Sequence, residues 1–239
     1  MPTSRLTLDT ADGPMPAYQA TPAGPARGGV VVIQEAFGVN EHIEDVCRRF
    51  ADAGWAAVAP ALFHRKGSPT VPYDDIPAVM PLMGELTAEG IAIDVDAAFA
   101  QLATLGYGPQ RVAIVGFCMG GSVSFATAVR RAVGAATTFY GGGIAQGRFG
   151  YPTQLAVGAE LKTPWLGLYG DLDKGIPSED VEKLRACVAN AKVPAEIVRY
   201  GDADHGFHCD DRPAVFNPVA AADGWARTLA WFDAHVAVS

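Results

Sequence analysis

Cys118 lies between two glycines, where an apolar run gives way to a helix-like stretch. Residues 112–121 read Val-Ala-Ile-Val-Gly-Phe-Cys-Met-Gly-Gly. This Gly-x-Cys-x-Gly pattern is typical of a nucleophile elbow, a sharp strand-to-helix turn in which glycines allow the two backbones to approach each other. The amide N–H of Met119 would then face a developing oxyanion, and the helix N-terminus would favour a thiolate. The alternative is a plain tight turn in which Cys118 is a small, inert, buried side chain.

A cysteine nucleophile needs a histidine as its base and a third group that orients the histidine. His205 is the best-placed histidine, because it follows the sixth apolar run in the loop before the last helix-like stretch. In hydrolases with such an elbow, the acid and then the histidine follow the nucleophile along the chain. His208, three residues later, is interpreted as a solvated loop histidine.

The orienting acid should leave the end of the fifth apolar run. The segment 169–177, Tyr-Gly-Asp-Leu-Asp-Lys-Gly-Ile-Pro, offers Asp171 and Asp173. A carboxylate at this place would fix the tautomer of the histidine and stabilise its imidazolium form. The spacing from the glycine and the Ile-Pro that follows favour Asp173, which leaves Asp171 as a loop-shaping or solvated residue.

A glutamate follows the first apolar run, in the segment Gln-Glu-Ala-Phe-Gly-Val-Asn at residues 34–40. In elbow hydrolases this loop supplies the second oxyanion N–H, which we assign to Ala36. The Glu35 carboxylate, beside a thiol, could hold the thiol proton. A structural ion pair between Glu35 and an arginine is the alternative.

Apolar runs and helix-like stretches alternate along the chain. The runs lie at 29–33, 55–59, 111–115, 135–140, 165–169 and 196–200, and the helix-like stretches at 41–53, 89–105, 120–133, 178–190 and 221–236. This order predicts an α/β fold with a mostly parallel sheet and helices on both faces. Residues 4–8 and 15–20 fit an antiparallel hairpin at one edge. The proline- and glycine-rich stretch 64–84 is interpreted as a long, lid-like loop within one domain spanning residues 1–239.

The composition and charge of the chain disfavour several classes of binding partner and cellular compartment. A net charge of −8 and the lack of a basic run disfavour nucleic acids and anionic membranes. No apolar run approaches the ~18–20 residues of a membrane span, and residues 1–20 do not read as a signal peptide. The four cysteines are widely separated and have no metal-like spacing. We therefore expect a cytoplasmic protein with reduced thiols and no metal site, acting as a monomer.

Taken together, these motifs resemble the dienelactone hydrolase (carboxymethylenebutenolidase) family over nearly the whole chain. The matching segments are 34–40, 60–63, 116–121, 173–177 and 205–207. The resemblance implies an α/β-hydrolase fold, no cofactor, and a catalytic triad of Cys118, His205 and Asp173. It also implies that Glu35 pairs with the resting thiol and is displaced when substrate binds.

The sequence departs from this family at two arginines that hold the substrate carboxylate in its best-studied members. Cys209 stands four residues after His205, where one of these arginines is expected, and residues 74–85 contain no arginine. Arg65 and Arg212 are the candidate replacements. Phe37, in the segment after the first run, and Tyr140, at the end of the fourth run, are further candidates for binding a substrate.

The sequence thus predicts hydrolysis of a small ester or lactone through an acyl-enzyme. A non-catalytic receptor that uses the same pocket is one alternative, although a complete triad in the right order argues against it. A redox-active thiol protein is another, with Cys209 as the only candidate resolving cysteine.

Overall fold

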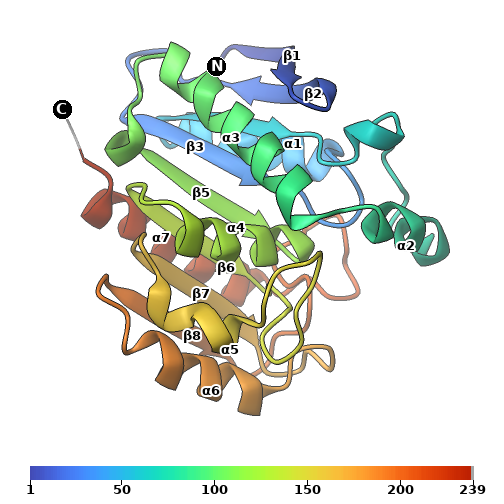
Figure 1. Cartoon of the computed structure of the whole chain (residues 1–239), viewed down its shortest axis with the longest axis vertical. Coiled ribbons are helices and arrows are strands. Elements are labelled where there is room, and N and C mark those ends of the chain that lie inside the picture. The colour runs from blue at the N-terminus through green and yellow to red at the C-terminus, as the bar shows by residue number, and fades with distance from the viewer. Residues whose placement is uncertain (238–239) are drawn as a thin grey trace.

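The computed structural model describes residues 1–237 and arranges them as an eight-stranded sheet between two layers of helices (Figure 1). In chain order the strands are β1 (Thr3–Thr10), β2 (Gly13–Ala20), β3 (Gly28–Ile33), β4 (Trp55–Pro60), β5 (Val112–Phe117), β6 (Ala135–Phe139), β7 (Trp165–Gly170) and β8 (Ala195–Tyr200). Their spatial order is β1-β2-β4-β3-β5-β6-β7-β8. The pairs β1–β2 and β2–β4 are antiparallel and all other pairs are parallel. The predicted hairpin at one edge and the mostly parallel sheet are both confirmed.

The central strands are contiguous apolar runs because both faces of the sheet are covered. Every residue of β3, β4, β5, β6 and β7 is buried. Such a strand shows no alternation of polar and apolar residues, since neither face meets water. β8 has only Ile197 buried and forms the other edge of the sheet.

Seven α-helices and three short 3-10 turns connect the strands within residues 1–237. They are α1 (Glu41–Asp52), η1 (His64–Lys66), α2 (Ile76–Gly84), α3 (Ala88–Thr104), η2 (Pro109–Arg111), α4 (Met119–Arg130), α5 (Gln154–Val157), η3 (Gly158–Glu160), α6 (Ser178–Val188) and α7 (Pro218–His235). α1 and α7 pack together on one face of the sheet, where Phe50 contacts Trp225 and Phe232. α3 and α4 lie on the opposite face, the near one in Figure 1. No single helix within residues 1–237 is long and apolar enough to cross a membrane, and only α2 and α3 together, bent by 93°, meet that test.

The prolines of residues 64–84 suggested one long loop, but the structure forms two short helices there. Residues 64–66 form η1 and residues 76–84 form α2. Pro77 lies in the first turn of α2, where its missing N–H removes no helical bond, and the Asp75 side chain caps the helix by accepting a hydrogen bond from Ala78 N at 3.2 Å. Pro81 lies inside the helix, which is only nine residues long. α2 projects from the body of the molecule beside the carboxyl ends of the strands (Figure 1).

The carboxyl ends of the parallel strands meet at one edge of the sheet, so the loops that follow β3, β5, β6, β7 and β8 lie close together. In open parallel sheets this edge is the usual place for a ligand site. Except for Arg65, which follows β4 in η1, the residues that the sequence singled out lie in or directly after these five loops.

Candidate active site

Cys118 occupies a strained turn between β5 and α4, with φ +55° and ψ −115°. A non-glycine residue in such a conformation costs on the order of 1–3 kcal/mol and persists only where its surroundings hold it. Here the surroundings are backbone: a Cβ on Gly116 would lie 1.8 Å from the Gly120 carbonyl oxygen. A Cβ on Gly120 would lie 2.5 Å from the carbonyl oxygen of Gln34. The two glycines that flank the cysteine are therefore required by contact between the two main chains.

His205 and Asp173 form a short hydrogen bond between the loops that follow β8 and β7. His205 Nδ1 lies 2.6 Å from Asp173 Oδ2, and the Asp173 residue is only 5% exposed. The other carboxylate oxygen of Asp173 accepts hydrogen bonds from Gly175 N at 2.8 Å and Ile176 N at 3.2 Å. These backbone bonds hold the carboxylate in one orientation, so that it fixes the imidazole in turn.

Cys118 acts electrostatically on the same imidazole. Burial disfavours the charged imidazolium and acts to lower the pKa of His205. Electrostatic attraction to Cys118 and the hydrogen bond to Asp173 outweigh burial and raise the pKa of His205 to about 10. Both neighbouring side chains therefore favour the protonated form of the His205 imidazole.

Two backbone N–H groups near Cys118 have no acceptor within residues 1–237. Met119 is the first residue of α4, so its N–H has no partner inside the helix. Ala36 follows β3 and also lacks an acceptor for its N–H in the described part of the chain. Both residues were predicted to form the oxyanion hole.

Glu35 is buried beside Tyr140 rather than paired with an arginine. Its Oε1 accepts a hydrogen bond from the Tyr140 hydroxyl at 3.3 Å, and its Oε2 has no partner within residues 1–237. No basic side chain of those residues lies within 4 Å of it, so the ion-pair alternative is wrong. Burial and the nearby carboxylate hold the pKa of Tyr140 well above 10, so this phenol is a hydrogen-bond donor. Its ring lies 5.1 Å from that of His205.

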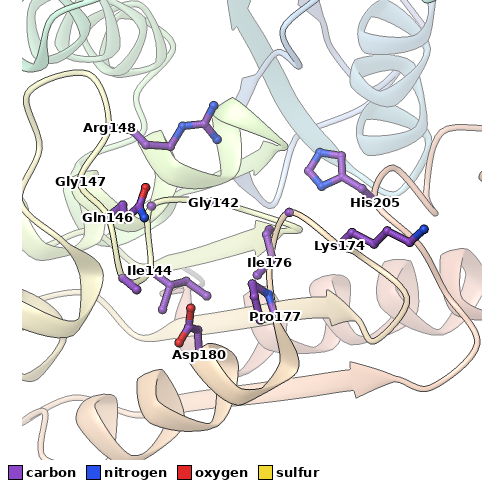
Figure 2. A pocket seen from close by; sticks show the side chains of 13 residues that line it. Gly142, Ile144, Gln146, Gly147, Arg148, Lys174, Ile176, Pro177, Asp180 and His205 are labelled. Atoms are coloured by element: carbon purple, nitrogen blue, oxygen red, sulfur yellow. The ribbon is translucent and has the colours of Figure 1, made fainter.

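A cavity of about 460 Å³ opens beside His205 (Figure 2). Its walls are the loop 142–148, which follows β6, and the segment 174–180, which joins β7 to α6. This volume lies within the range of small-molecule sites. No group of three or more His, Cys, Asp or Glu side chains within residues 1–237 is arranged to hold a metal ion.

A family model described as "Dienelactone hydrolase family" matches residues 15–236. The chain belongs to the dienelactone hydrolase family. A protein of Escherichia coli O157:H7, provisionally named carboxymethylenebutenolidase, is 39% identical over 224 residues, which cover 91% of this chain and 82% of that protein. A protein of the same provisional name from Methylorubrum extorquens is 37% identical over 234 residues, which cover 95% and 79% of the two chains.

The solved structures agree with this family assignment. A crystal structure from Klebsiella pneumoniae, provisionally named a dienelactone hydrolase, matches with a TM-score of 0.90 and 36% identity over 97% of this chain and 98% of that one. The fold is that of the α/β-hydrolases, as the sequence predicted. This member of the dienelactone hydrolase family is therefore a hydrolase of that type.

The two arginines proposed as replacements occupy different surroundings. Arg65 bonds the buried Asp94 at 2.8 Å and Asp12 at 2.5 Å, so its charge is already neutralised and its predicted role in substrate binding is not supported. Arg212 has no carboxylate partner within residues 1–237. Its guanidinium lies 5.6 Å from the ring centroid of Phe37, beside the site.

His208 is not the solvated loop histidine that its position in the sequence suggested. It is 2% exposed, and its ring packs 5.1 Å from Phe117, 4.9 Å from Phe139 and 6.0 Å from Trp225. Burial lowers the pKa of His208 to about 3, so this imidazole is neutral. It supports the strand ends beneath the elbow instead of taking part in proton transfer.

The other aspartate, Asp171, lies outside the group formed by Cys118, His205 and Asp173. Its Oδ1 accepts a hydrogen bond at 2.6 Å from Arg199 Nε, on β8. This pair ties the loop after β7 to the edge strand.

The sequence analysis missed a buried polar group beside Glu35. Cys209 Sγ donates to the Tyr73 hydroxyl at 3.3 Å, and Asn40 Nδ2 donates to the same hydroxyl at 2.9 Å. Burial and the negative charge of Glu35 raise the pKa of the Cys209 thiol to about 12. No local sequence pattern predicts this group, because its members come from segments far apart in the chain.

Proposed function

We propose that the chain hydrolyses a small carboxylic ester or lactone through a thioester acyl-enzyme on Cys118, with His205 and Asp173 as the other members of a catalytic triad. The observation that carries this proposal is the Asp173–His205 hydrogen bond of 2.6 Å on an imidazole whose pKa is raised by Cys118. Residues 1–239 would act as one domain, with α2 beside its active site.

In the first half-reaction the Cys118 thiolate attacks the carbonyl carbon and forms a carbon–sulfur bond. The carbonyl oxygen becomes an oxyanion, which the free N–H groups of Met119 and Ala36 stabilise. When the tetrahedral intermediate collapses, the carbon–oxygen bond to the alcohol breaks. The leaving oxygen then takes a proton from Nε2 of the His205 imidazolium.

In the second half-reaction water replaces the alcohol. Neutral His205 removes a proton from water as the water oxygen attacks the thioester carbon, and the Cys118 thiolate leaves. The carboxylic acid departs and the imidazolium–thiolate pair is restored. The buried Asp173 carboxylate stabilises the imidazolium in both halves of the cycle. All of these steps use water and side chains of this chain.

Glu35 has a separate part in the proposal. Its Oε2 is buried and unpartnered within residues 1–237, while its Oε1 is held by Tyr140. We assign Oε2 as the acceptor that holds the thiol proton of Cys118 before substrate binds. When substrate displaces Glu35, the thiol passes this proton to His205, which forms the imidazolium–thiolate pair of the first half-reaction. Phe37 and Arg212, which lie against each other beside the site, are the proposed contacts for the substrate.

The deciding experiment compares Cys118→Ala with wild type on p-nitrophenyl acetate and on simple enol-lactones. We expect turnover to fall at least about 1,000-fold in the variant, because the nucleophile of a triad cannot be replaced by its other members. Mass spectrometry of quenched wild-type enzyme should show an acetyl adduct on the peptide that contains Cys118. Cys187→Ala is the matched control, because this half-buried cysteine lies on α6 and bonds the Leu155 carbonyl.

Full turnover by Cys118→Ala would remove this cysteine from the mechanism. Binding of the esters without turnover by wild type would favour the receptor alternative. The redox alternative has less support, because a resolving cysteine must form a thiolate and the pKa of Cys209 is about 12.

A further inference from the structure

A second cavity, of about 200 Å³, lies between α4, α5 and the loop 142–152. We call it the α4–α5 cavity. The α4 residues that line it are spaced at i, i+3, i+4 and i+7, so they form one face of the helix: Ser122, Phe125, Ala126 and Val129. Cys118, Asp173 and His205 do not line it. The α4–α5 cavity is therefore distinct from the catalytic group.

Most of the side chains around the α4–α5 cavity are apolar, and several of them are incompletely covered. Phe125 is buried, whereas Ala126 and Val129 are only half-buried. Val157, the last residue of α5, and the ring of Tyr151 also line the cavity and are half-buried. A ligand that removes this apolar surface from water gains free energy by the hydrophobic effect.

Gln154 gives the cavity an acceptor that lacks a donor. The residue is 4% exposed and lines the cavity as the first residue of α5. Its Nε2 donates to the Gly142 carbonyl at 2.8 Å, and its Oε1 has no hydrogen-bond partner in the described part of the chain. The amide cannot be reversed, because its oxygen would then face the carbonyl oxygen of Gly142. A ligand that donates an O–H or N–H to Oε1 would remove the penalty of a buried acceptor without a partner.

The wall between the α4–α5 cavity and the larger cavity beside His205 is a single layer of the chain. Gly142, Gly143 and Arg148 line both cavities. A Cβ on Gly143 would lie 3.6 Å from Arg148 Cγ, so the methylenes of this arginine pack over the glycine. The Gly142 carbonyl accepts from Ser122 Oγ at 2.7 Å, which ties the wall to α4. A ligand in the α4–α5 cavity would thus lie behind the wall of the active-site cavity.

We propose that the α4–α5 cavity is a second ligand site, which binds a neutral molecule made of one aromatic ring and one O–H or N–H donor. Phenol is the simplest member of this class. The volume sets the size of the ligand, since an engineered apolar cavity of about 150 Å³ in another protein binds benzene. The ring packs against Phe125 and Tyr151, because aromatic rings attract one another edge-to-face or offset. The donor bonds Gln154 Oε1.

The polar groups around the cavity favour a neutral ligand over a charged one. A carboxylate has only acceptors, so Oε1 of Gln154 would repel it. An ammonium ion would be repelled by Arg130 and Arg148, which also line the cavity. Either ion would in addition lose its hydration against apolar walls. A neutral donor avoids all of these costs.

The test is a ¹H–¹⁵N NMR titration of the full chain with phenol and with fluorobenzene, which has nearly the same size but no donor. Wild type should bind phenol saturably, with the largest shift changes at the amides of Ala126, Val129 and Gly143 and at the side-chain amide of Gln154. Fluorobenzene should bind about 2- to 10-fold more weakly, because it cannot donate to Oε1. In Gln154→Met, which keeps the length of the side chain and removes the acceptor, the two affinities should agree within about twofold.

A larger side chain at Val129 tests the location of the ligand. Val129→Phe fills the α4–α5 cavity and should abolish saturable binding of both probes. Val198→Phe is the matched control, because it makes the same change at a half-buried valine on β8. Its affinities for the two probes should stay within about twofold of wild type, since this position is far from the cavity.

The proposal is overturned if wild type shows no saturable binding of phenol. Undiminished binding in Val129→Phe, or shift changes centred on Cys118 and His205, would also overturn it, because the ligand would then lie elsewhere. An equal preference for phenol in wild type and Gln154→Met would remove Oε1 as the acceptor and with it the proposed class of ligand. All of these measurements are of binding, so their failure leaves the proposed hydrolysis untouched, and a failure of hydrolysis leaves this site untouched.

Discussion

Replacement of Asp173 by asparagine isolates the orienting carboxylate without changing the size of the side chain. In the wild type, Oδ1 accepts two backbone hydrogen bonds, from Gly175 and Ile176, and Oδ2 lies 2.6 Å from Nδ1 of His205. An asparagine that keeps the two backbone bonds must place its carbonyl oxygen at the Oδ1 position. Its amide NH₂ then faces Nδ1, which is forced to act as an acceptor, and the imidazole proton moves to Nε2. The neutral histidine is left in the tautomer that cannot accept a proton from water or thiol.

The size of the effect follows from the two interactions that are lost. A hydrogen bond to a charged group is worth about 1.5–3 kcal/mol, or roughly 10- to 150-fold in rate. The wrong tautomer adds to this loss, and the same substitution in a Ser-His-Asp triad costs about 10⁴-fold. We therefore expect kcat/KM of Asp173→Asn for p-nitrophenyl acetate near neutral pH to fall between about 100- and 10,000-fold. A flipped asparagine would instead lose two backbone bonds, which thermal denaturation would detect as lower stability.

Asp171→Asn provides the matched control, two residues away in the same loop. Asp171 is paired with Arg199 near the surface, and such a pair is worth about 0.2–1 kcal/mol. The activity of this variant should stay within about threefold of wild type. Equal losses in the two variants, or a larger loss in Asp171→Asn, would refute the assignment of Asp173 as the orienting acid.

Two further predictions follow from the geometry of the elbow and its histidine. The imidazole of His205 should titrate near pH 10 in the folded protein, because Cys118 and Asp173 favour its charged form over an unfolded value of about 6.5. The stabilisation that this pairing gives is thus fully present below about pH 6.5 and is lost as pH rises through about 10. Cys118→Ser removes the sulfur that favours the charged imidazole, so it should lower the titration midpoint of His205 in ¹H–¹⁵N NMR spectra. An unchanged midpoint would mean that Cys118 does not act on His205. Gly116→Ala should prevent stable folding, at a cost above about 4 kcal/mol, because the added Cβ would meet the Gly120 carbonyl. Gly84→Ala is the control, because its added Cβ meets nothing within 4 Å. Its free energy of unfolding in urea should differ from that of wild type by less than about 1 kcal/mol.

The strands and the elbow could be predicted from the sequence because their determinants are local. A strand buried on both faces is a contiguous apolar run, and the turn at Cys118 needs glycines at fixed positions beside it. α2 was missed because Pro77 and Pro81 suggested a loop, although a proline in the first turn of a helix removes no hydrogen bond. The choice of Asp173 over Asp171 was made from the spacing to the glycine and from the Ile-Pro that follows, and the structure places Asp173 2.6 Å from His205.

The remaining features depend on contacts between distant segments, which no local pattern contains. His208 is buried by aromatic side chains from β5, β6 and α7, so its loop position was misleading. Arg65 finds its partner Asp94 on α3, 29 residues further along the chain.

The contacts of Gly116 and Gly120 have a wider consequence for how this enzyme can evolve. The sulfur is located by main chain resting on main chain, so its coordinates do not depend on which apolar side chains fill the interior around it. Interiors accept many combinations of apolar residues when volume is conserved. Substitutions elsewhere in the interior should therefore change the melting temperature well before they displace the Cys118 sulfur. Stability could then change during evolution while the position of this sulfur is kept.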